Sequence, residues 1–179
     1  MNIIAFAAST SKHSINKQLV AYTLTQFDSD NCTLLDLNDF EMPLFSVDLE
    51  AASGHPDAAK RLLANIASAD LLIISMAEHN GNFTAAFKNI FDWCSRVEAN
   101  VFQNKPLLLL STSPGGYAGK NALEAAIARF PRHAATIVET FSLPSFATNF
   151  DVETGITNEA LKTELLEKIT RVKLTMAVV

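Results

Sequence analysis

The chain has 179 residues, of which 49% are hydrophobic, and this is enough for one domain with a substantial core, so we predict a single domain over residues 1–179. A net charge of −5 and a pI near 5.3 argue against a nucleic-acid or acidic-membrane partner, because the sequence contains no basic stripe. Two cysteines fit neither a disulfide framework nor a zinc ligand set, and no signal peptide or membrane-spanning run is visible, so we expect a cytoplasmic protein without a membrane partner.

The first 27 residues predict a strand, a turn and a helix. Ile3 to Ala7 is a short apolar run, and small polar residues follow in Ala8 to Ser14. Apolar residues then recur at helical spacing, at Leu19, Val20, Leu24 and Phe27. This order is half of a βαβ unit, which is the element from which parallel sheets are built.

The rest of the chain continues the alternation. Apolar runs predict strands over Cys32–Leu37, Asp70–Met76, Lys105–Leu110 and Thr136–Phe141. Helices are predicted over Asp57–Ser68, from Thr84 onward, over Asn121–Phe130 and over Asn158–Met176. Two long segments, Phe40–Pro56 and Ser142–Thr157, lack periodicity and are predicted to be irregular. The apolar content of the first argues against disorder, and we expect it to cap a pocket or to meet a second subunit.

Five strands alternating with helices imply a parallel sheet with helices on both faces. Because no sixth strand is predicted, we expect a flavodoxin-like three-layer α/β sandwich with strand order 2-1-3-4-5 rather than the six-stranded dinucleotide fold. In that order, ligands bind beyond the carboxyl ends of strands 1 and 3. The turns Ala8–Ser14, Ala77–Asn82 and Ser111–Gly119 leave the sheet at that edge, so they should converge on one ligand.

The first of these turns has the composition of an anion site. Ser14 can cap the following helix, but no acidic residue follows in the first turn, where one would complement the helix dipole. Instead, cationic and hydrogen-bonding side chains gather there, namely Lys12, His13, Lys17, Ser9, Ser11 and Asn16. We interpret the turn as a phosphate cradle, with an ordinary polar loop capped by serine as the alternative. The glycines of a P-loop or a dinucleotide fingerprint are absent.

The second and third turns suit a flat ring. Asn80 and Gly81 make the second turn pliable, and Glu78 and His79 add polar groups beside them. In the third turn, the missing side chains of Gly115 and Gly116 let a planar group approach the backbone. A ligand with a phosphate at one end and a planar, hydrogen-bonding ring at the other would match all three turns, and FMN is such a ligand.

Several segments match the motifs of one known family. Ser9, Ser14 and Asn16 fall on the Ser, Ser and Asn of a G-S-x-R-x-x-S-x-N phosphate motif. The residues that match a P-E-Y-N-G segment followed by K-N-x-x-D-W are Glu78, Asn80, Gly81, Lys88, Asn89, Asp92 and Trp93. Ser113–Gly116 has the expected S-P-G-G character, and Met42–Glu50 is similar to an L-P-L-Y stretch. Over most of its length the chain therefore resembles the NADPH-dependent FMN reductase family, flavodoxin-like reductases of quinones, azo dyes and metal ions.

Four positions depart from the family's motifs: Ala8 replaces Gly, Ser11 replaces Arg, Ala77 replaces Pro and His79 replaces Tyr. Losing the Arg removes a bidentate phosphate partner, which Lys12 replaces only in part because it is a point charge on a flexible stem. Weaker FMN binding is one expected result. The imidazole at position 79 places a titratable ring near the flavin, where it would alter the potential or the choice of substrate.

The resemblance implies FMN as cofactor and NADPH or NADH as the hydride donor, with electrons passing from the flavin to a quinone-like or other small-molecule acceptor. It also implies a homodimer or homotetramer with the flavin near the subunit boundary. Since the flavin carries the chemistry, no catalytic residue is predicted. The predicted cofactor-binding residues are Ser9, Ser11, Lys12, Ser14, Ile15, Asn16, Ala77, Glu78, His79, Asn80, Gly81, Ser113, Gly115 and Gly116.

Three further expectations concern individual side chains. We expect Glu78 to order its loop by binding backbone amides rather than to act as a general base. Lys88 and Asp92, four residues apart on one helix, are expected to form a local surface pair, and the family resemblance implies that this helix helps to build the dimer. No metal site is predicted, because the histidines outside the second loop lack ligand spacing with acids or cysteines.

Two alternatives remain open from the sequence. One is a flavin-binding or electron-carrier protein of the same fold without its own reductase turnover. A net charge of −5 and the serine-rich first loop argue against this, since carrier flavodoxins tend to be more acidic and to use a threonine-rich loop. The other is a protein whose altered first loop has lost FMN and which retains the fold for binding or assembly.

Overall fold

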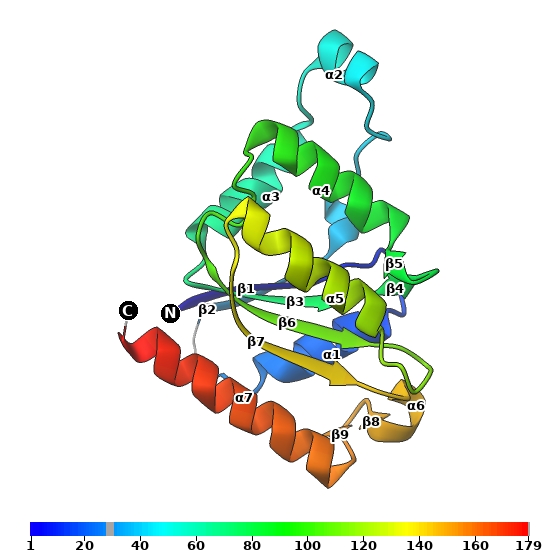
Figure 1. Ribbon diagram of the computed structural model, residues 1–179, viewed down its shortest axis with the longest axis vertical. Coiled ribbons are helices and arrows are strands. Elements are labelled where there is room, and N and C mark those ends of the chain that lie inside the picture. The colour runs from blue at the N-terminus through cyan, green and yellow to red at the C-terminus, as the bar shows by residue number, and fades with distance from the viewer. Residues whose placement is uncertain (28–30, 179) are drawn as a thin grey trace.

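The computed structural model describes residues 1–27 and 31–178, and its centre is one parallel sheet (Figure 1). The strands are β1 (Asn2–Ala7), β2 (Asn31–Leu35), β3 (Leu71–Met76), β6 (Pro106–Thr112) and β7 (Thr136–Leu143). They lie in the order β2-β1-β3-β6-β7 and every neighbouring pair is parallel. Numbered along the chain, this is 2-1-3-4-5, so the predicted flavodoxin-like order is confirmed. The predicted single domain, 1–179, includes residues 28–30 and 179, which lie outside the described part.

Helices cover both faces of the sheet, which confirms the three-layer sandwich. The helices α1 (Ile15–Leu24) and α7 (Glu159–Val178) lie on one face, and α3 (Asp57–Ser68), α4 (Ala85–Val97) and α5 (Lys120–Arg129) lie on the other (Figure 1). Successive side chains of β1 show why both faces are apolar: Ile3 packs with the α1 and α7 cluster and Ile4 with the α3 and α4 cluster. All six residues of β3 are buried, as expected for a central parallel strand.

The first segment predicted to be irregular, Phe40–Pro56, contains one helix and the last residue of a 3-10 turn, so that prediction was wrong in part. The 3-10 turn η1 (Leu37–Phe40) follows β2, and a helix, α2 (Val47–Ser53), stands apart from the body at the top of Figure 1. Ser46 caps α2 by accepting a hydrogen bond from the Leu49 amide, and Gly54 ends it at φ 69°. No residue of α2 is buried, so the helix has no apolar face for periodicity to reveal.

The second such segment also contains short elements, α6 (Phe146–Asn149) and a hairpin of β8 (Phe150–Asp151) and β9 (Gly155–Ile156). The Phe146 and Phe150 rings stack with centroids 4.6 Å apart, and Tyr22 of α1 meets Phe150 edge-on at 5.8 Å. Gly155 has φ +81°, and a Cβ there would lie 2.0 Å from Tyr22 Cε2. Elements of two to four residues are too short to show a period, which is why the sequence did not predict them.

Two features are absent from residues 1–27 and 31–178. None of their helices combines the length and apolarity needed to cross a bilayer. They also contain no group of three or more His, Cys, Asp or Glu side chains arranged to hold a metal ion.

Candidate functional site

The three predicted turns meet at the carboxyl end of the sheet around one cavity of about 280 Å³. Its wall combines residues that follow β1, β3 and β6, which are Ser9, Ser11, His13, Ser14, Ile15, Asn16, Ala77, Glu78, His79, Thr112, Ser113 and Pro114. Three larger hollows have volumes of about 310, 440 and 460 Å³. The first lies between η1 and α4 and includes Thr10 of the first turn, the second lies between α5 and α7, and the third lies between α1 and the β8–β9 hairpin. None of the three is lined by residues from all three turns, so the smaller cavity is the candidate site.

Asn16 joins the start of α1 to the ends of β3 and β6, from which the second and third turns leave the sheet. It is 4% exposed, and its Oδ1 accepts hydrogen bonds from Ser75 Oγ at 2.7 Å and from the Thr112 amide at 3.1 Å. Its Nδ2 donates to the Thr112 carbonyl at 3.2 Å. The carboxamide of Asn16, a predicted cofactor-binding residue, therefore binds other groups of the protein. These bonds fix the start of α1 against the ends of β3 and β6.

The first turn presents donors at the start of α1. Ser14 is the N-cap, and its Oγ accepts a hydrogen bond from the Lys17 amide at 3.2 Å. The amides of Ile15 and Asn16 occupy the first helical positions, where no carbonyl of the helix lies within reach, and α1 has no acidic residue in its first turn. Ser9 Oγ accepts from the Ser11 amide at 3.2 Å, which shapes the turn. These groups suit an anion, as predicted.

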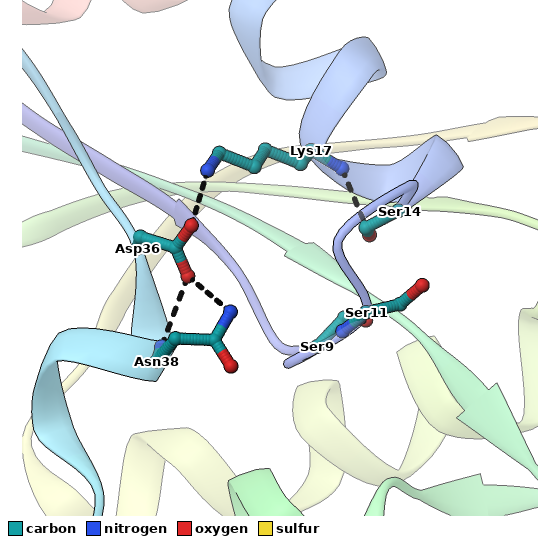
Figure 2. Close-up of polar contacts among 6 residues, drawn as sticks. All are labelled: Ser9, Ser11, Ser14, Lys17, Asp36 and Asn38. Atoms are coloured by element: carbon teal, nitrogen blue, oxygen red, sulfur yellow. Dashed lines mark hydrogen bonds and ion pairs between the residues drawn. The ribbon is translucent and has the colours of Figure 1, made fainter.

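Lys17 does not reinforce this donor set, contrary to the sequence-based expectation that its charge serves the anion site. Its Nζ binds Asp36 Oδ2 at 2.5 Å, and Figure 2 shows the ammonium directed at Asp36, away from the turn that carries Ser9 and Ser11. The hydrogen bond from Lys17, followed by one from the Asn38 amide, holds the pKa of the Asp36 carboxyl below its usual range. Lys12 in the same turn is exposed.

The second turn is a two-residue hairpin between β4 (Glu78–His79) and β5 (Asn82–Phe83). Asn80 and Gly81 at its tip have φ of 51° and 74°, as a type I′ turn requires of both central residues. The Glu78 carboxylate accepts hydrogen bonds from Asn121 Nδ2 at 3.1 Å and from the Ala122 amide at 3.2 Å, at the start of α5. The prediction that Glu78 orders its loop through a backbone amide is confirmed.

The third turn leaves open space beside its glycines. A Cβ added at Gly115 or Gly116 would meet no protein atom within 4 Å, and neither residue has a positive φ. The protein's own packing therefore does not require glycine at these two positions, whereas Gly119 has φ +71° and lies against the Thr112 carbonyl. Hydrogen bonds from the Ser145 amide to the Gly115 carbonyl, at 3.0 Å, and from the Phe146 amide to the Ser113 carbonyl, at 3.1 Å, anchor the loop to α6.

Most of the predicted cofactor-binding residues line the cavity, and five do not. Those five lie in the same turns but outside its wall: Lys12, Asn80, Gly81, Gly115 and Gly116. The cavity also includes residues that were not predicted as site residues, His13, Thr112 and Pro114. The sequence offered one signal for these three residues. Each lies next to a predicted site residue, Ser14 or Ser113, in a turn that had already been singled out.

The helix that carries the K-N-x-x-D-W match has a clear role within its own chain. Lys88 Nζ lies 2.8 Å from Asp92 Oδ1, which confirms the predicted local pair. Asn89 Oδ1 accepts from the Phe45 amide at 2.8 Å, and Trp93 Nε1 donates to the Pro43 carbonyl at 2.8 Å. These bonds fix the segment that leads to α2.

This fold and this site define a class: a flavodoxin-like α/β protein with three turns around one cavity at the carboxyl edge of its sheet. The profile of the NADPH-dependent FMN reductase family matches residues 1–148, so the chain belongs to that family. The resemblance inferred from the motifs is confirmed.

Individual relatives agree with this assignment. A quinone reductase of Escherichia coli (strain K12) is 28% identical over 120 residues, 66% of this chain and 63% of its own. A 2-hydroxy-1,4-benzoquinone reductase of a Burkholderia species is 31% identical over 116 residues, 64% of this chain and 62% of its own. The match thus spans somewhat less than two thirds of each relative's length.

Among solved structures, the flavoenzyme NAD(P)H:(acceptor) oxidoreductase of Paracoccus denitrificans has a similar fold. It superposes with a TM-score of 0.75 at 21% identity, over 96% of this chain and 95% of its own. An azoreductase of Bacillus anthracis superposes with a TM-score of 0.63 at 19% identity, over 96% of this chain and 98% of its own. Both similarities concern the fold alone.

Proposed function

We propose that the protein is an FMN-dependent NAD(P)H oxidoreductase that passes electrons to a quinone-like or other small-molecule acceptor. The observation that carries the proposal is one cavity whose wall comes from all three turns, with the serines of the first turn and the start of α1 as anion donors in that wall. Membership of the family and the names of the relatives support the same activity.

The phosphate end of FMN would lie at the start of α1. The hydroxyls of Ser9, Ser11 and Ser14 line the cavity there, and the amides of Ile15 and Asn16 have no intrahelical acceptor. The α1 dipole favours an anion at this position, and Lys12 adds a cationic charge from the surface of the same turn. Ser14 also keeps its hydroxyl proton for the ligand, since its oxygen is the acceptor in the capping bond.

The ring would lie against the second and third turns. When bound, FMN supplies the redox chemistry, accepting a hydride from the nicotinamide and returning electrons to the acceptor. Ala77 and His79 line the cavity on one side and Ser113 on the other. The open space beside Gly115 and Gly116 leaves room for the ring edge or for a second substrate. Asn16 and Glu78 act as positioning residues, because their side chains bind neighbouring loops.

We also propose that the protein is a homodimer or homotetramer located in the cytoplasm. The support for assembly is the segment that ends in α2, where Leu44 is 82% exposed and Val47 is 69% exposed. Arg96 Nε of α4 donates hydrogen bonds to both carboxylate oxygens of Glu50 in α2, each at 3.0 Å. This contact holds the exposed segment in place. Multi-angle light scattering of the wild type and of the double variant L44D/V47D tests the assembly; an unchanged mass in the variant would contradict a contact through this segment.

The proposed activity is tested in two steps on the purified protein. Titration with FMN should quench the flavin fluorescence to saturation at one FMN per chain. The FMN-loaded protein should then oxidise NADPH or NADH continuously when menadione is added. Binding without turnover would leave the flavin-carrier alternative, and absence of quenching would leave a protein that retains the fold without the flavin.

A further inference from the structure

Lys17, at the start of α1, is held by the carboxylate of Asp36, the residue that directly follows β2. Lys17 is the third residue of α1, directly after the amides of Ile15 and Asn16. Its Nζ lies 2.5 Å from Asp36 Oδ2, and both side chains are about one third exposed, at 36% and 34%. The pair joins the start of α1 to the end of β2 (Figure 2).

Asp36 cannot easily follow Lys17 toward the cavity, because a second set of bonds fixes its carboxylate. Oδ1 accepts hydrogen bonds from the Asn38 amide at 2.9 Å and from Asn38 Nδ2 at 2.7 Å. Through the first of these bonds Asp36 caps η1 (Figure 2). The position of the carboxylate is thus set by the turn after β2, and the lysine adjusts to it.

Without this partner, the lysine would belong to the anion site. Side chains of a helix point back toward its N-terminus, and four methylene groups give Lys17 the reach to approach a phosphate bound there. An ammonium near that phosphate would add to the attraction of the helix dipole and the serine hydroxyls. The family motif places an arginine at position 11, where this chain has serine. The residues of the cavity wall include no lysine or arginine, and the basic side chains among them are the imidazoles of His13 and His79.

We infer that Asp36 is a positioning residue that weakens the binding of the FMN phosphate by holding the Lys17 ammonium away from it. The inference rests on the proposed function, since it concerns the affinity of the same site. In the wild type, FMN would therefore be held by neutral donors and by the exposed Lys12. Its affinity would be lower than in a protein whose Lys17 is free to approach the phosphate.

The test is a fluorescence-quenching titration of the wild type, Asp36→Asn and the matched control Asp39→Asn with FMN and with riboflavin, which lacks the phosphate. Asparagine at 36 keeps an oxygen for the Asn38 amide and removes the charge. The Kd for FMN should fall about two- to fivefold in Asp36→Asn, the factor that corresponds to an exposed ion pair. The Kd for riboflavin should not change, and Asp39→Asn, which loses a charge on η1 itself, should bind both ligands as the wild type does.

The double variant D36N/K17M identifies the lysine as the cause. If the gain comes from a released ammonium, most of it should disappear when Lys17 is replaced by methionine. A gain that persists in the double variant, an equal gain for riboflavin, or unchanged or weaker FMN binding by a folded Asp36→Asn protein would each overturn the inference. Should Asp36→Asn fail to fold, Asp36→Ser retains a capping oxygen without the charge and replaces it in the same comparison.

Failure of the inference and failure of the proposed function give different results. A wild type that quenches FMN with an affinity unaffected by Asp36→Asn refutes the inference alone. If FMN does not bind, inorganic phosphate titrated against ¹⁵N-labelled protein is the remaining probe, read at the amides of Ile15 and Asn16. Tighter phosphate binding in Asp36→Asn would then support the role of Asp36 without the flavin, and equal binding or none would overturn it.

Discussion

Replacing Asn16 by alanine should both destabilise the fold and weaken ligand binding, because one carboxamide joins the start of α1 to the ends of β3 and β6. The substitution removes its hydrogen bonds to Ser75 Oγ, to the Thr112 amide and to the Thr112 carbonyl. All three partner groups belong to buried residues. Leaving buried groups unpaired costs about 1 kcal/mol or more each, so we expect a loss of about 3 kcal/mol in the free energy of unfolding.

Urea denaturation followed by circular dichroism measures this loss, and for a chain of this size it corresponds to a melting temperature lower by about 6–12 °C. The matched control is Thr23→Val on the same helix, where a buried hydroxyl donates to the Leu19 carbonyl at 2.8 Å far from the turns. That carbonyl also serves the helix, so the control should cost less than about 1 kcal/mol and leave the Kd for FMN unchanged.

The reasoning would be refuted if Asn16→Ala lost less than about 1 kcal/mol, the lower limit for groups left unpaired in a core. It would also be refuted if the variant lost stability and yet bound FMN as tightly as the wild type does. The second result would mean that the turns hold their relative positions without the shared carboxamide.

Three further predictions follow from single positions. Gly155→Ala should lower the free energy of unfolding by about 2 kcal/mol, measured by urea denaturation, because its Cβ would lie 2.0 Å from an aromatic ring of α1 at φ +81°. In Gly116→Ala the added Cβ meets no atom within 4 Å, so this variant should keep the wild-type stability, and equal losses in the two variants would contradict this contrast. Burial raises the pKa of the Cys94 thiol to about 12. Ellman's reagent at neutral pH should therefore react only with the exposed Cys32 until denaturant is added. A second thiol that reacts rapidly in the native protein would be inconsistent with the burial of Cys94. The pKa of Asp36 is lowered in the folded protein, so its contribution to stability is complete above the unfolded value of about 3.9 and is lost as the pH falls through the folded value. Wild type and Asp36→Asn should therefore differ in melting temperature at pH 6, and the difference should shrink progressively as the pH is lowered below the unfolded value. A difference that stays constant would show that the charge is not the cause.

The sheet and the position of the site could be predicted because their signals are local. β3 and β6 each contain a run of four consecutive Leu or Ile residues, and strands buried on both faces need no further pattern to be located. Once the order of parallel strands follows from alternation, the turns after β1, β3 and β6 must emerge at one edge. The turn at Asn80 and Gly81 was equally local, since both residues tolerate the positive φ that the hairpin needs.

The pairing of polar side chains could not be predicted in the same way, because the partners are distant in the sequence. Asn16 was predicted to bind the cofactor, but its carboxamide binds residues 59 and 96 positions away. Lys17 was expected to serve the anion, and its true partner lies on the turn after a different strand. In both cases composition identified the right turn, and only the three-dimensional arrangement decides which group each side chain binds.

Helix α2 shows a different limit. Its signals were present as Ser46 at the N-cap, acidic residues in the first turn and Gly54 at the end, but they are capping signals without an apolar face. No residue of α2 is fully buried, and its contact with the core comes from the partly buried Leu49. A single apolar contact leaves no hydrophobic periodicity, so the stretch was interpreted as irregular. Exposed Leu44 and Val47 beside it now support the proposal that this segment meets a second subunit.

The central claim is that three turns at one edge of the sheet hold one FMN, and a crystal structure of the protein grown with FMN tests it most directly. The account predicts electron density for the phosphate at the start of α1, among Ser9, Ser11 and Ser14, and for the ring between the turns that carry His79 and Ser113. Density for the flavin elsewhere on the molecule, or saturating FMN with none in this cavity, would contradict it.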